Sequence, residues 1–101
     1  MMTVSKQSVK LLVGPLIIWM REGGDPWAAN LANWNTRREL MAKGEMFDGP
    51  AASTLSNIDT AMDSFSLARD RGDHQIDEAQ LRKELGAAIE QLRKLGYLAE
   101  Q

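Results

Sequence analysis

Apolar residues recur every three or four positions along most of the chain, which is the spacing of one face of an α-helix. The pattern predicts four helices, at approximately 4–21, 26–43, 52–71 and 77–95. No segment alternates apolar and polar residues over several positions, so no sheet is expected. The sequence therefore predicts an all-α fold, a compact bundle of about four helices forming a single domain over residues 1–101, with an irregular orthogonal packing as the alternative.

The starts of the second and fourth helices carry the clearest signals. Asp25 is placed to cap the second helix, and Pro26 suits its first helical position. Asp77 and Gln80 have the spacing of a capping box at the start of the fourth helix. The first helix is the least regular, because Pro15 removes a backbone donor and predicts either a kink or two short helices.

Two of the predicted helices carry a stripe of residues at successive spacings of four, three, four and three. In the second helix the stripe is Trp27, Leu31, Trp34, Arg38 and Met41. In the fourth helix it is Leu81, Leu85, Ala88, Leu92 and Leu95. We expect the tryptophan stripe to face the core, although one exposed Trp would suit a protein interface. The leucine stripe also has the spacing of a short coiled coil, which leaves pairing with a second copy open.

Charge changes this picture, because the acids are concentrated in the middle of the chain. Residues 44–80 contain eight Asp or Glu and two Lys or Arg, whereas residues 1–43 contain three and six. An acidic surface attracts a basic partner, although it also serves solubility alone. The candidate partner-binding residues are Asp59, Asp63, Asp70 and Asp73.

The chain lacks the residues that most catalytic and metal-binding sites require. The chain has no cysteine, which excludes disulfides and zinc–thiolate sites. It has no phosphate-binding glycine motif, and the acids around His74 do not have the spacing of a calcium loop. Asp59 and Asp63 are an example of a carboxylate pair at helical spacing, and we expect them to be solvated. We therefore expect no metal, no cofactor and no enzymatic activity.

The apolar run at 11–20 follows two lysines and looks superficially like a signal peptide. It lacks a cleavage site, and it is shorter than the roughly 18–20 residues that span a bilayer. We interpret it as a buried helix, and we expect a cytoplasmic protein without membrane contact.

These observations favour a non-enzymatic protein-binding module, with an acidic immunity or antitoxin-type inhibitor of a basic partner as its sharpest form. One alternative is a DNA-binding or regulatory protein using the fourth helix, which carries Arg82, Lys83, Arg93 and Lys94. Glutamates interleave with these bases, so nucleic acid is not the expected partner. A homo-oligomeric adaptor is the other alternative, and the oligomeric state stays open.

The order of several short landmarks resembles an uncharacterised family of small bacterial helical proteins. The matching stretches are 24–27 (GDPW), 42–45 (AKGE), 62–65 (MDSF) and 72–74 (GDH). The resemblance covers most of the chain and implies an all-helical fold. It implies no established function, no enzyme activity and no site residues.

Overall fold

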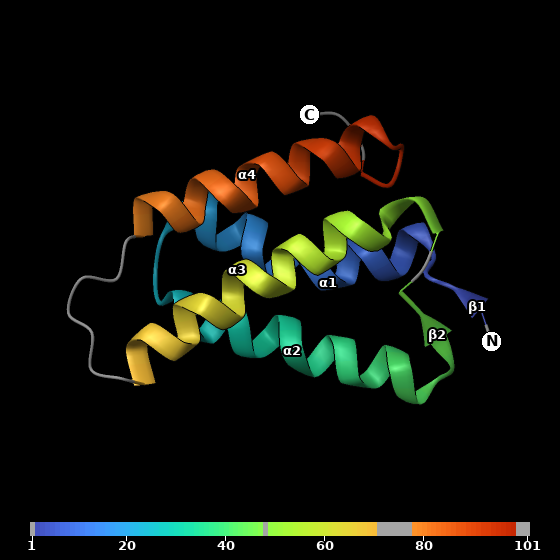
Figure 1. Cartoon of the computed structure of the whole chain (residues 1–101), viewed down its shortest axis with the longest axis horizontal. Helices are drawn as coiled ribbons and strands as arrows, with labels where there is room; N and C mark the ends of the chain where they lie inside the picture. Colours follow the sequence, from blue (N-terminus) through green and yellow to red (C-terminus); the bar gives the residue numbers. More distant parts are fainter. Residues whose placement is uncertain (1, 48, 71–77, 99–101) are drawn as a thin grey trace.

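Four helices provide most of the regular structure in the computed structural model, which describes residues 2–47, 49–70 and 78–98. They are α1 (Lys6–Glu22), α2 (Pro26–Ala42), α3 (Ala52–Asp70) and α4 (Glu78–Lys94). The helices pack pairwise, α1 with α2 and α3 with α4, and α1 also touches α4. Figure 1 shows α3 crossing in front of α1, with α4 and α2 on either side. The predicted all-α class is confirmed.

The helix ends follow local signals in the sequence. The Asp25 side chain accepts a hydrogen bond from the Trp27 amide at 2.9 Å, and Pro26 opens α2 as predicted. Ser5 caps α1 in the same way, accepting from the Ser8 amide at 3.1 Å. Gly44 follows α2 with a φ of 88°, a left-handed conformation that glycine adopts without strain. The Asp77 capping signature lies outside the described residues.

The chain also forms one very short parallel pairing that its pattern did not indicate. β1 (Met2–Thr3) pairs with β2 (Glu45–Met46), and Met2 lies opposite Glu45. The pairing is reinforced at the start of α1, where the Ser8 hydroxyl donates to the Glu45 carboxylate at 2.6 Å. A negative charge at a helix N-terminus is favourable, because the free amides there carry partial positive charge. These contacts fasten the end of α2 to the beginning of α1.

One hydrophobic cluster joins all four helices. Its largest fully buried side chains are Leu12, Leu16, Ile58, Met62, Leu85, Leu92, Val9 and Val13. Burial of apolar surface on this scale is the main favourable term in folding. The apolar run at 11–20 therefore contributes to the core, as predicted. Within the residues described, no helix is both long enough and apolar enough to cross a membrane.

Helix α1 continues through Pro15 as a single element, so the expectation of two short helices is wrong. Proline has no backbone N–H, so the carbonyl of Leu11 lacks its usual helical donor. Burial of residues on both sides of the proline, Leu12 and Leu16, holds the helix together across that missing bond. The tertiary packing thus overrides the local cost of proline.

Candidate functional site

The leucine stripe of α4 lies in the core, as its spacing predicts. Leu81, Leu85 and Leu92 are 4%, 0% and 0% exposed, and only Leu95 at the end of the stripe reaches solvent. This stripe is already covered inside the monomer. A homo-oligomer built by pairing α4 with its copy therefore loses its structural basis.

The matching stripe of α2, here called the α2 seam (Trp27, Leu31, Trp34, Arg38 and Met41), faces solvent along most of its length. Leu31 is 50% exposed, Trp34 is 43% exposed and Met41 is 60% exposed. Trp27 is half-buried at the start of the helix. The prediction that the tryptophan stripe faces the core is therefore wrong for Trp34, Leu31 and Met41.

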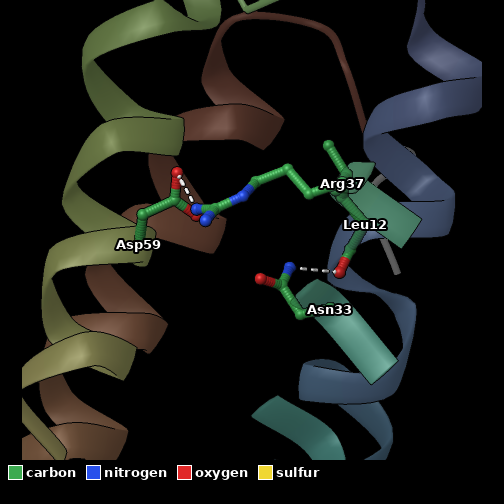
Figure 2. A network of polar contacts seen from close by, with 4 residues as sticks. All are labelled: Leu12, Asn33, Arg37 and Asp59. Carbon is green, nitrogen blue, oxygen red and sulfur yellow. Dashed lines mark hydrogen bonds and ion pairs between the residues drawn. The ribbon is translucent and has the colours of Figure 1, made fainter. Parts of the chain in front are cut away.

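A different face of α2 is buried, and it combines Leu40 with small and polar residues. Ala29 and Leu40 enter the core, and Asn33 between them is 4% exposed. The Asn33 amide nitrogen donates to the carbonyl oxygen of Leu12 at 2.8 Å, within the helical turn of α1 that contains Pro15 (Figure 2). Because small side chains allow close approach, this face lets α2 dock directly onto α1.

Polar contacts hold the adjacent flank of α2 against α3. Arg37 forms an ion pair with Asp59, as Figure 2 shows, and Asn30 donates to the Ser66 hydroxyl at 2.5 Å. With Asn33 bound to α1, three polar side chains fix the rotation of α2 about its axis. That rotation turns the α2 seam outward.

The candidate acids of α3 lie on the flank that faces α2. Asp59, Asp63, Ser66 and Asp70 are spaced by four, three and four residues, so they share one face of the helix. Asp59 and Ser66 touch α2, which places Asp63 along the same edge. Asp63 and Asp70 are exposed, and neither forms an ion pair with another described residue. We call these two residues the acidic edge.

Asp59, unlike Asp63, is paired within the described part of its own chain. Burial raises the pKa of the Asp59 carboxyl above its ordinary value, and the charge of Asp63 raises it further. The hydrogen bond and positive charge of Arg37 lower the pKa without cancelling that effect. A carboxylate that is partly buried and paired within its own chain is poorly placed to bind a partner. The structure thus brings Asp59 and Asp63 together on one face of α3, but only Asp59 forms an ion pair within the described residues.

Arg38 sits within the α2 seam and covers part of Trp34. Its guanidinium carbon lies 4.7 Å from the centre of the Trp34 ring, within the range of a cation–π contact. Trp and Arg are the residue types most often found at the energetic centres of protein interfaces. The seam therefore has an aromatic and cationic centre, with Leu31 and Met41 to either side along the helix.

The remaining sequence features are His74 with its neighbouring acids and the basic residues of α4. Asp73 and His74 lie outside the described residues, and among those described no group of His, Cys, Asp or Glu could hold a metal ion. The bases of α4 are partly engaged within the protein. Arg82 donates to the Met20 carbonyl at 2.9 Å and stacks over the Trp19 ring at 4.4 Å, and Arg93 pairs with Glu90. Lys83 and Lys94 are exposed together with Glu84 and Glu90, so α4 presents a surface of mixed charge.

A groove of about 520 Å³ runs between α3 and α4, away from the α2 seam. Hydroxyl, amide and alanine side chains line most of it, and Glu84 is its charged lining residue. Glu84 is exposed and accepts a hydrogen bond from Gln80 at 3.1 Å. The groove thus offers no buried charge with which to fix a ligand.

One signal in the sequence could have identified the exposed seam. Arg38 stands near the middle of the stripe, and an arginine is rarely buried without a paired acid. The buried alternative, Ala29 with Asn33 and Leu40, was harder to find because Ala29 is small and Asn33 is polar. Comparisons of the chain with family profiles, curated proteins and solved structures found no match. The resemblance to small bacterial helical proteins therefore stays a prediction.

Proposed function

We propose that this protein is a non-enzymatic protein-binding module for a basic partner, with an immunity or antitoxin-type inhibitor as its sharpest form. The observation that carries the proposal is the position of the acidic edge. Asp63 and Asp70 are exposed directly beside a helix whose outer face presents Leu31 and Trp34 to solvent. Acidic and apolar groups on one continuous surface suit a partner with complementary charge, because burial supplies affinity and charge supplies steering.

Electrostatics favours a basic partner over an acidic one. The segment that contains the acidic edge holds eight acids and two bases, and these charges act together over several ångströms. Proteins that act on nucleic acids present basic surfaces to phosphates, so an acidic surface of this kind suits their inhibition. Arg37 neutralises Asp59, which concentrates the available charge on Asp63 and Asp70.

The test uses the full-length protein, tagged, to capture its partner from extracts of its own host. In the test variant, Asp63→Lys and Asp70→Lys reverse the acidic edge while Asp59 and its ion pair stay intact. The control, Glu84→Lys and Glu90→Lys, makes the same charge change on the exposed surface of α4. The comparison between the two variants separates a local effect from a change in net charge.

We expect the Asp63/Asp70 variant to reduce capture at least tenfold at low salt and to lose most of the salt dependence. The α4 control should capture the same partner as the natural protein. Equal capture by both variants, or equal loss in both, would refute a role for the acidic edge. The inhibitor form adds one requirement: the captured protein should act on RNA or DNA, and its activity should fall when this protein is added.

A further inference from the structure

The spacing of the α2 seam specifies the shape of what covers it. Intervals of four, three, four and three residues place side chains along one line of a helix, which is the pattern that packs against a second helix. Within this same molecule, the identical spacing in α4 is covered, and Leu85 and Leu92 there are 0% exposed. In α2, Leu31, Trp34 and Met41 are 43–60% exposed. The α2 seam therefore has the pattern of a helix-packing surface and no helix on it within the described residues.

The surroundings of the seam specify the charge of that missing helix. On one side the seam is bordered by α3, which Arg37 and Asn30 hold in place through Asp59 and Ser66. The acidic edge lies along that border, so any helix lying on the seam has one side close to Asp63 and Asp70. Uncompensated acids next to a bound helix are unfavourable unless that helix supplies Lys or Arg.

A second copy of this chain does not meet that requirement. If two α2 helices packed antiparallel about a two-fold axis, both α3 helices would lie on the same side of the seam. The two acidic edges would then face each other. If they packed in parallel, Arg38 would lie against its own copy. Each arrangement brings like charges together, which weakens association.

We propose that the α2 seam and the acidic edge together receive a single amphipathic α-helix of a partner protein. The apolar residues of that helix pack on Leu31, Trp34 and Met41, and Lys or Arg along one side lies over Asp63 and Asp70. This proposal rests on the proposed function and adds the structural class of the partner element to it. A helix bound in this way supplies anchors three, four and seven residues apart, and the α2 seam repeats at the same intervals.

The experiment titrates the full-length ¹⁵N-labelled protein with a designed helical peptide of leucine and lysine. The peptide places Leu at heptad spacing along one face and Lys along one side. One control peptide has the same composition with alternating Leu and Lys, and another replaces Lys with Glu. The indole N–H signal of Trp34 is assigned by its loss in Trp34→Phe. The indole of Trp19 serves as an internal reference, because it is buried and donates to the Gly24 carbonyl at 3.2 Å.

We expect the helical Leu/Lys peptide to shift the Trp34 indole and the amides of Leu31, Met41 and Asp63 saturably. The Trp19 indole should stay in place. Trp34→Ala should weaken binding at least tenfold, and Asp63→Asn with Asp70→Asn should weaken it and reduce its salt dependence. Both control peptides should bind at least tenfold more weakly than the helical Leu/Lys peptide.

Three results would overturn the helix proposal. The first is a helical peptide that binds no better than the alternating control, and the second is a set of shifts confined to the groove between α3 and α4. The third is a dimer in analytical ultracentrifugation that Trp34→Ala dissociates, because a second copy would then cover the seam. Capture of the natural partner separates this proposal from the function. If reversal of Asp63 and Asp70 abolishes capture and Trp34→Ala leaves it unchanged, the function stands and the helix does not.

Discussion

Two leucines at equivalent positions of the two stripes test whether the α2 seam is exposed in solution. Leu85 belongs to the α4 stripe and is 0% exposed, whereas Leu31 belongs to the α2 seam and is 50% exposed. Leu85→Ala and Leu31→Ala remove the same atoms from helices of equal length. Any large difference between the two variants therefore reports the surroundings of the side chain.

The structure sets the size of that difference. Replacing a fully buried leucine by alanine costs about 2–5 kcal/mol, because burial is lost and a cavity remains. Full burial of a leucine contributes about 1.5–3 kcal/mol, so half-burial of Leu31 contributes on the order of 1 kcal/mol. Water fills the space left at Leu31, and alanine favours the helix slightly more than leucine does. We expect Leu31→Ala to cost less than about 1 kcal/mol and Leu85→Ala more than about 2.

The assay is urea and thermal unfolding of both variants and the natural protein, followed by circular dichroism and repeated at several protein concentrations. For a domain of this size, about 1 kcal/mol corresponds to roughly 4–8 °C in melting temperature. Leu85→Ala should therefore melt at least about 8 °C lower, and Leu31→Ala within a few degrees of the natural protein. Comparable losses in the two variants would refute the outward orientation of the seam. A loss of stability in Leu31→Ala that grows with protein concentration would instead show that a second copy of the chain covers Leu31.

Three further substitutions test the polar contacts. Asn33→Ala should cost about 1–2 kcal/mol in urea unfolding, because a buried hydrogen bond to α1 is lost, and a cost near zero would refute that bond. Asp59→Asn tests the raised pKa of Asp59. Because the folded protein holds the Asp59 proton more tightly than the unfolded chain does, this residue stabilises the fold most below the unfolded pKa of about 3.8. That contribution is lost as pH rises through the higher folded pKa. The free energy of unfolding of Asp59→Asn should therefore increase relative to that of the natural protein as pH rises through that window. A relative decrease would show that the attraction between Asp59 and Arg37 outweighs the cost of burying the Asp59 charge. Arg82→Met should cost about 1–2 kcal/mol, since its hydrogen bond and ring contact to α1 are lost. The matched control Arg93→Met, which removes an exposed ion pair, should cost less than about 0.5 kcal/mol, and equal costs would contradict the difference.

The sequence was sufficient for the helices and much of the core, because those features depend on local patterns. All four helices begin and end within two residues of the predicted bounds. Asp25 and Pro26 define the start of α2 without help from the rest of the chain. The α4 stripe was assigned correctly to the core. The other face of α4 consists mainly of charged and polar residues, so only one orientation of the helix buries its apolar side chains.

The orientation of α2 could not be predicted in the same way. Its larger apolar stripe is on the outside, and the buried face depends on contacts with residues distant in sequence. Asn33 reaches a carbonyl of α1, and Arg37 reaches Asp59, 22 positions along the chain. Periodicity shows that a helix has a distinct face, but it does not show which neighbour that face meets. The candidate acids could not be distinguished from the sequence for the same reason, because only the tertiary structure pairs Asp59 and leaves Asp63 exposed.

The rotation of α2 links the stability of the monomer to the proposed function. Trp34 directly follows Asn33, so a turn of about 100° around the helix axis would exchange the buried and exposed faces. Polar contacts contribute roughly 1 kcal/mol each, whereas full burial of one large apolar side chain contributes about 1.5–3 kcal/mol. The observed rotation therefore leaves favourable burial of Leu31 and Trp34 unrealised in the monomer. The proposed partner helix would realise it on binding, and the polar anchors would keep the seam oriented for that helix beforehand.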